Sequence, residues 1–194
     1  MKTYPNLKSI KVGDLKFILR DGTSDLKAVE EVVINKAYRR RDFLVEPGET
    51  WLDIGANCGA NVIAFEPDPD NATMAQMNID NNGLSKRVEL KRVGLTDSDK
   101  AKVFKLFRNT ANGNLWRNSL FKEWRGGESI PVNTEPVGNY WKSDCCVKLD
   151  AEGVEMPILE KYAQIKVKKL VFEWSFDIDP SLARFEKVIK TLRA

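Results

Sequence analysis

Two acidic residues, Asp53 and Glu66, accompany two short apolar runs of the chain. Asp53 lies inside the first run, and Glu66 directly follows the second. Between them, Gly55 and Gly59 let the backbone turn tightly and approach a ligand, because glycine has no Cβ. A carboxylate at the end of a strand can accept two hydrogen bonds from a ribose diol. This order of residues therefore predicts a nucleoside-binding edge of an open α/β sheet.

The glycine spacing indicates which nucleoside would bind. Dinucleotide-binding loops use G-x-G-x-x-G and seat a pyrophosphate at a helix N-terminus, whereas the spacing here is G-x-x-x-G. Asp53, just before this loop, would repel a pyrophosphate and suits a ligand with an ammonium or sulfonium charge, such as S-adenosylmethionine. The alternative is a tight turn with an incidental acid. The position of Glu66-Pro67 at the end of the second run favours the cofactor interpretation.

A second group of acids ends two later apolar runs. Asp150 ends the run that begins at Cys145, Glu152 follows closely, and Glu173 ends another run. Since parallel strands end at one edge of a sheet, these acids are expected in the same crevice as the cofactor. Transfer of a methyl group from S-adenosylmethionine to a hydroxyl requires a base that removes the hydroxyl proton. The chain has no histidine, so this base must be a carboxylate, a lysine, a tyrosine or water. We predict Asp150 as this base, with Glu152 and Glu173 as further catalytic acids.

A divalent metal is compatible with this group of carboxylates. Several carboxylates together could raise the pKa of one of them into a useful range. They could equally bind a metal ion that acidifies the acceptor hydroxyl. The sequence permits a metal but does not require one.

These motifs resemble those of a known family. D-I-G-A-N-C-G at 53–59, A-F-E-P-D-P at 64–69 and K-L-D-A-E-G-V-E at 148–155 are similar to the hallmarks of the FkbM family of S-adenosylmethionine-dependent O-methyltransferases. Phe172-Glu173 resembles the end of that family's fifth strand, and the matches lie in order over roughly residues 10–180. The resemblance implies that the cofactor is held by Asp53, Gly55, Ala56, Asn57, Gly59, Glu66 and Pro67. It also implies a methyl acceptor that is a hydroxyl of a sugar or glycan, for example a deoxysugar such as rhamnose, or of a hydroxylated natural product.

Further candidate site residues lie between the two groups of acids. Gly94 and Leu95 end a strand expected to begin at Val88, where they are placed to flank adenine; the alternative is a plain strand end and turn. Residues from about 108 to 141 are expected to be irregular, and a loop of that length is usually functional or mobile. Its aromatic and polar side chains would suit a sugar, and the candidates are Trp116, Arg117, Asn118 and Ser119. The alternative is an insertion without such a role.

Composition narrows the class of protein. A chain of 194 residues with 42% apolar and 30% charged residues is typical of one globular domain. No run reaches the length of a membrane span and the N-terminus lacks a signal-peptide core, so a cytoplasmic location is expected. Cys58, Cys145 and Cys146 have neither disulfide nor zinc spacing. The net charge of +3 is too small to imply nucleic acid, so the expected partner is a small-molecule or glycan acceptor, with no indication of oligomeric state.

Two other functions fit parts of the sequence. The basic cluster at 39–41 follows an expected helix and either balances the helix dipole or contacts phosphates. An RNA methyltransferase would use this cluster together with the tryptophan-rich loop. A non-catalytic Rossmann-like binding module would keep the fold as a scaffold without a working cofactor site.

The expected architecture is α/β, a Rossmann-like class I methyltransferase sheet with helices on both faces. Residues 1–46 form an N-terminal cap, with a β-hairpin over 7–19 that turns at Gly13-Asp14 and a helix from Ser24 or Asp25 to near Arg40. Residues 47–194 form the S-adenosylmethionine-binding domain, in which strands alternate with helices. Its expected strands lie at 51–54, 62–65, 88–95, 101–107, 145–150 and 170–174, and its helices begin after Asp68, after Gly153 and after Asp179-Pro180.

One connection conflicts with this architecture. Too few residues separate Gly59 from the second strand to form a helix, whereas parallel neighbours need a crossover of about ten or more residues. Asp53 and Glu66 are 13 residues apart, against roughly 20 in dinucleotide folds. Either this protein has lost its first helix, or the sequence lacks segments near 59–60 and 131–144. We favour the second explanation.

Overall fold

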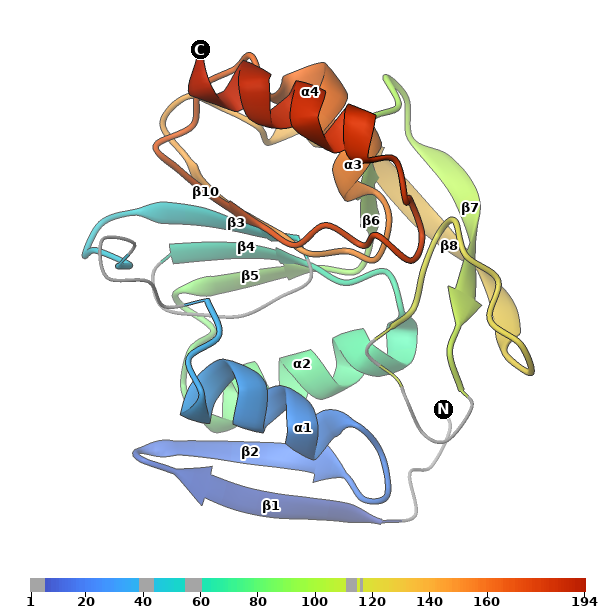
Figure 1. The fold of residues 1–194 in the computed structure, drawn as a ribbon. Coiled ribbons are helices and arrows are strands. Elements are labelled where there is room, and N and C mark those ends of the chain that lie inside the picture. Colours follow the sequence, from blue (N-terminus) through green and yellow to red (C-terminus); the bar gives the residue numbers. More distant parts are fainter. Residues whose placement is uncertain (1–5, 39–43, 55–60, 111–114, 116) are drawn as a thin grey trace.

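The centre of the protein is a five-stranded parallel sheet in the order β10-β9-β3-β4-β5 (Figure 1). The computed structural model describes residues 6–38, 44–54, 61–110, 115 and 117–194. The sheet consists of Thr50–Ile54 (β3), Asn61–Phe65 (β4), Val88–Lys91 (β5), Cys146–Leu149 (β9) and Lys169–Phe172 (β10). Every neighbouring pair is parallel, so the carboxyl ends of the strands meet at one edge. The predicted Rossmann-like α/β sheet is confirmed.

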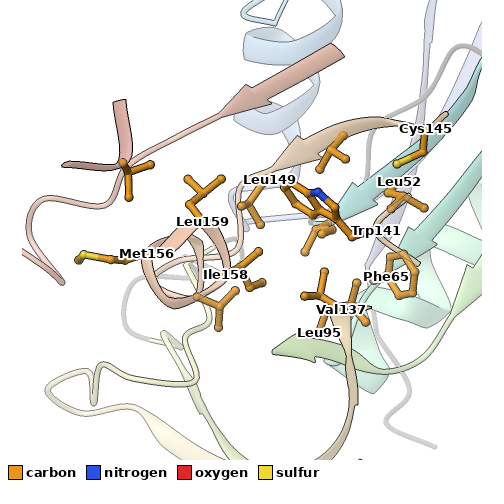
Figure 2. Packing of buried hydrophobic residues seen from close by; sticks show 14 of the residues in the cluster. Leu52, Phe65, Leu95, Val137, Trp141, Cys145, Leu149, Met156, Ile158 and Leu159 are labelled. Carbon is orange, nitrogen blue, oxygen red and sulfur yellow. The ribbon is translucent and has the colours of Figure 1, made fainter. Parts of the chain in front are cut away.

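Helices α3 (Glu155–Tyr162) and α4 (Leu182–Arg193) cover one face of this sheet (Figure 1). The sheet side chains on this face and the helix side chains opposite them form the main hydrophobic core (Figure 2). Its members include Leu52, Ile54, Phe65, Val147, Leu149, Ile158, Leu159 and Val188. Full burial of such a side chain stabilises the fold by about 1.5–3 kcal/mol. This face therefore supplies packing rather than chemistry.

The opposite face is lined by fewer apolar side chains. Trp51, Val62, Ala64 and Cys146 form a small buried cluster there. Figure 1 shows α2 (Pro69–Asn81), α1 (Asp25–Val29) and the N-terminal hairpin on this side of the sheet, so the prediction of helices on both faces is confirmed. Asp68 begins α2 as predicted, because its carboxylate accepts the backbone N–H groups of Asp70 and Asn71.

The N-terminal cap has the predicted hairpin but a shorter helix than expected. Strands Leu7–Val12 (β1) and Leu15–Arg20 (β2) pair antiparallel. Helix α1 (Asp25–Val29) continues as the π-helical turn η1 (Glu30–Ile34), so the expected end near Arg40 is wrong. The N–H of Asn35 closes a wide turn onto the carbonyl of Glu30, and Lys36 then takes a φ of +56°, which ends the helix. The basic cluster at 39–41 lies outside the described residues.

Two asparagines, Asn78 within α2 and Asn82 at its C-cap, attach the hairpin to the rest of the protein. The Asn78 amide accepts the N–H of Ile18 at 2.7 Å and donates to its carbonyl at 3.0 Å. The Asn82 amide does the same for Lys16, at 2.8 and 2.7 Å. These amides thus form hydrogen bonds with backbone groups on the free edge of β2, as a third strand would. An unpaired edge strand could otherwise pair with another chain. The cap is therefore fixed directly on α2.

A second, three-stranded sheet lies beside the main sheet (Figure 1). It consists of Gly94–Thr96 (β6), Lys102–Arg108 (β7) and Glu128–Pro136 (β8), in the order β6-β8-β7. The strand expected over 88–95 is therefore wrong, because β5 and β6 belong to different sheets. The irregular structure expected from 108 to 141 is also wrong beyond residue 127. Pro131 and Pro136 concealed the long strand β8, since proline is uncommon within strands.

The short crossover between β3 and β4 is compatible with parallel pairing. Six residues, 55–60, link the two strands, and Thr50 lies in register with Asn61. At about 3.3–3.6 Å per residue, six extended residues can return along a strand of this length. Residues 131–139 belong to β8 and to the 3-10 helix η3 (Val137–Asn139), and Val137 and Trp141 lie in the core. In the described part of the chain, no helix is long and apolar enough to cross a membrane.

We expect Asn78→Ala to lower the free energy of unfolding by about 1–3 kcal/mol, because it leaves two backbone groups of Ile18 unpaired. Asn81→Ala is the matched control, since Asn81 donates only one hydrogen bond, to a Lys16 carbonyl that Asn82 also satisfies. Urea unfolding of both variants measures the difference. Equal stability of the two variants would contradict a role for Asn78 in attaching the cap.

Candidate functional site

A cavity of about 450 Å³ lies between the N-terminal cap and the carboxyl edge of the main sheet. The strand ends contribute a charged wall made of Glu66, Lys148, Asp150, Glu152 and Glu173. The cap contributes the opposite wall, which combines apolar side chains of β2 and α1 with Tyr38 and the charged residues Arg20, Asp25 and Glu31. In open α/β sheets ligands bind outside the carboxyl ends of the strands. The cavity has this position.

A smaller cavity of about 80 Å³ continues from the first. Glu66, Asp150 and Glu152 line both cavities, so the two share a wall. The predicted adenine-flanking residues Gly94 and Leu95 line the smaller one, together with Pro67. The cofactor candidates after β4 and in β6, far apart in the sequence, therefore surround one space.

Asp53 and Glu66 lie on the same face of the sheet. Asp53 stands in register with Ala64, and Glu66, two residues further on, continues the strand by donating its N–H to the carbonyl of Lys91. Because side chains alternate along a strand, all three point to one side. Glu66 reaches the cavities directly, whereas Asp53 is 1% exposed and lies beneath Lys148.

Lys148 connects the two groups of predicted site residues. Its ammonium lies 3.4 Å from Asp53 Oδ1 and 3.5 Å from Asp150 Oδ2. Burial lowers the pKa of Lys148, but the two neighbouring carboxylates raise it more, so the pKa lies above its ordinary value and the side chain stays charged. Lys148 thus holds a positive charge between the cofactor candidate on β3 and the predicted base after β9.

Burial raises the pKa of both carboxyls that are predicted to bind the cofactor, Asp53 and Glu66. The pKa of Asp53 rises to about 7 because the carboxyl is removed from water, although Lys148 opposes this shift. The pKa of Glu66 rises to about 8 for the same reason, although it accepts the N–H of Asp68 at 2.8 Å. A bound cation or hydrogen-bond donor would stabilise either carboxylate.

The three predicted catalytic acids differ in their surroundings. Asp150 accepts a short hydrogen bond from the hydroxyl of Tyr38. Glu152 has a φ of +52° and pairs with Arg117 at 3.2 Å, and burial raises its pKa. Glu173 is exposed at the cavity wall, where partial burial and then Asp150 raise its pKa. The structure brings all three to one cavity, with Asp150 in the most constrained position.

The predicted substrate-binding residues mainly bind the protein itself. Arg117 lines the large cavity, but its guanidinium also pairs with Asp177 at 2.7 Å and stacks on Trp124. Asn118 donates to Asp68 at 2.9 Å. Ser119 is fully buried and donates to the carbonyl of Glu152 at 2.6 Å. These contacts support the loop that carries Glu152, and Trp116 lies outside the described residues.

Asp68 is fixed by a buried ion pair that the sequence did not reveal. Arg108 on β7 donates to both of its carboxylate oxygens, at 2.7 and 2.8 Å, and the two side chains are 8% and 3% exposed. Breaking one partner of such a pair typically costs about 3–5 kcal/mol. The pair holds the start of α2, and hence Glu66, against the second sheet.

Several predictions lie beyond what the structure describes. The glycine-loop candidates Gly55, Ala56, Asn57 and Gly59, and also Cys58, fall outside the described residues. Cys145 and Cys146 are free and buried. Within the described ranges, no three His, Cys, Asp or Glu side chains are arranged to hold a metal ion. Sequence reasoning assigned no site role to Tyr38 or Lys148. Lys148 stands in a motif next to Asp150, whereas no pattern marks Tyr38.

A parallel sheet with acids at its carboxyl ends and a cavity across them is consistent with a Rossmann-like methyltransferase fold. The family model described as "Methyltransferase FkbM domain" matches residues 49–194. The chain therefore belongs to the FkbM family of methyltransferases, as its motifs predicted. No curated protein and no solved structure gives a significant match.

The raised pKa values of Asp53 and Glu66 predict a pH dependence of stability. Because both folded-state pKa values, about 7 and about 8, lie above the unfolded ones, the stabilising contribution is present at acidic pH. It is lost as the pH rises through those values. The free energy of unfolding should therefore fall between about pH 4 and pH 8, and Asp53→Asn should remove at most about 4 kcal/mol of that change.

Urea unfolding at a series of pH values tests this dependence in the ligand-free protein. Glu186→Gln is the control, because Glu186 is exposed on α4, far from the cavity. A slope unchanged by Asp53→Asn would show that Asp53 does not titrate in this range.

Proposed function

We propose that this protein is an S-adenosylmethionine-dependent O-methyltransferase. The acceptor would be a hydroxyl of a sugar or glycan, for example a deoxysugar such as rhamnose, or of a hydroxylated natural product. The observation that carries the proposal is a single cavity wall with two carboxyls of different proposed roles. Glu66 after β4 would bind the cofactor, and Asp150 after β9 would act on the acceptor. Membership of the FkbM family supports the methyl-transfer part. The substrate range rests on the resemblance of the motifs.

The donor set around the cavity fits S-adenosylmethionine. Glu66 offers a carboxylate to a ribose diol at the wall shared by both cavities. Both carboxylate oxygens of Asp53 are buried without a hydrogen bond from the described residues, although Lys148 pairs with one of them at 3.4 Å. Asp53 lines neither of these cavities, so it would act on a bound ligand through Lys148. Gly94, Leu95 and Pro67 would then adjoin the adenine.

The chemistry divides between the cofactor and the protein. When bound, S-adenosylmethionine would supply an electrophilic methyl group with its sulfonium sulfur as the leaving group. The protein must hold the acceptor oxygen in line with that carbon and remove its proton. Asp150 would take the proton, and Glu152 and Glu173 would hold the acceptor through hydrogen bonds.

Two further predictions belong to this proposal. Residues 1–46 would act as a cap over the cofactor-binding domain, 47–194, because the cap forms one wall of the large cavity. A cytoplasmic location would suit the free, buried thiols of Cys145 and Cys146.

We expect Glu66→Gln to weaken S-adenosylmethionine binding by about 10- to 100-fold, because hydrogen bonds to a charged acceptor are worth about 1.5–3 kcal/mol. Calorimetric titration with S-adenosylmethionine and S-adenosylhomocysteine measures the affinities, with Glu186→Gln as the control. Failure of the native protein to bind either compound would reject the cofactor assignment.

We expect Asp150→Asn to reduce turnover by about 100-fold or more with cofactor affinity unchanged, because the amide cannot accept the proton. Transfer of a radiolabelled methyl group to a panel of glycans, deoxysugars and hydroxylated compounds measures turnover. Native-like turnover by this variant would remove Asp150 from the role of base.

A further inference from the structure

The N-terminal cap contacts the predicted base through one side chain. Tyr38, four residues after η1 ends, donates its hydroxyl hydrogen to Asp150 Oδ2. The Lys148 ammonium lies 4.8 Å from the centre of the Tyr38 ring, a cation–π contact. Tyr38, Lys148 and Asp150 all line the large cavity. The cap and the sheet therefore meet at this carboxylate.

The two oxygens of Asp150 have different surroundings. Oδ2 receives the Tyr38 hydroxyl and lies 3.5 Å from Lys148 Nζ. Oδ1 has no hydrogen-bond or ion-pair partner among the described residues. The Asp150 side chain is 23% exposed and borders both cavities. One oxygen is thus fixed by the protein and the other is left for a ligand.

We propose that Tyr38 and Lys148 are positioning residues that fix Asp150 Oδ2, so that Oδ1 faces the acceptor hydroxyl. The inference rests on the proposed function, because it concerns how Asp150, the proposed proton acceptor of that reaction, is held in place. It follows the general arrangement in which a catalytic base is oriented by a third group. It also gives the cap a direct part in the reaction centre.

The proton has a defined path in this arrangement. It passes from the acceptor hydroxyl to Oδ1 as the acceptor oxygen gains the methyl group, while Lys148 and Tyr38 keep their own protons. Tyr38 keeps its proton because burial, and then the neighbouring charges of Asp150, Glu173 and Glu31, raise its pKa. Further charged groups near Asp150 in the described part of the chain are Asp53, Glu152 and Glu155.

An acceptor-free experiment tests the contact itself. In protein labelled with 3-fluorotyrosine, the fluorine NMR signal that is absent from Tyr38→Phe identifies Tyr38. Asp150→Asn should shift this signal and move its ionisation to lower pH, because a negative neighbour is removed. Tyr140 is an internal control, since its hydroxyl donates to Glu135, away from the cavity. A Tyr38 signal unaffected by Asp150→Asn would overturn the proposal.

A kinetic experiment tests the positioning role. With methyl rhamnoside as the acceptor probe, Tyr38→Phe should lower kcat about 10-fold or more and leave the acceptor KM and the S-adenosylmethionine Kd unchanged. The matched control Tyr140→Phe loses the same kind of phenol–carboxylate bond and should keep full kcat. A Tyr38→Phe variant with unchanged or higher kcat, or with a lower acceptor KM, would overturn the proposal, since Tyr38 would then be inert or would compete with the acceptor.

The two proposals fail in different ways. If Asp150→Asn is inactive but Tyr38→Phe turns over normally, only the positioning role is rejected. If the native protein methylates none of the hydroxyl compounds, the proposed function is rejected, while the fluorine signal still decides whether Tyr38 and Asp150 interact.

Discussion

A buried ammonium between two carboxylates is the interaction on which the site depends. Lys148 on β9 lies 3.4 Å from Asp53 on β3 and 3.5 Å from Asp150 at the end of its own strand. A buried charge without a partner costs several kcal/mol, and a buried pair offsets that cost when its geometry is good. A register shift of one residue between β3 and β9 would move these side chains to opposite faces. The charges therefore select the strand register that also builds the cavity.

The two faces of the main sheet have separate tasks. The face under α3 and α4 is apolar and closely packed, and it holds the strands in place. The other face carries charged side chains near the strand ends, where complete packing would exclude a ligand. The cap closes this second face from the side through β2, α1 and Tyr38. A rigid apolar layer thus supports a polar layer that keeps space for binding.

The sequence predicted those strands and helices that are marked by patterns of neighbouring residues. Short apolar runs that end in acids identified β3, β4 and β9, and Asp68 with Pro69 identified the start of α2. Asp53, Glu66 and Asp150 could be grouped because parallel strands end at a common edge. The sequence therefore predicted the fold and the position of the crevice.

The remaining features depend on tertiary packing. Strand β8 pairs along its length with β7 despite two prolines, and pairing of this kind cannot be seen from composition. The early end of the first helix depends on a π-type turn and on the left-handed backbone of Lys36. The contact of Tyr38 with Asp150 joins residues 112 positions apart. No local sequence pattern predicts a contact between residues so far apart in the chain.

The asparagine contacts of α2 have a mechanical consequence. One end of this 13-residue helix carries Asp68, next to Glu66, and the other end carries the amides that grip β2. A helix of this length, roughly 20 Å, transmits a tilt at one end to the other with little internal bending. Any shift of the hairpin would therefore also move Glu66, the proposed ribose-binding carboxylate, so that α2 couples the position of the cap to that of the cavity wall.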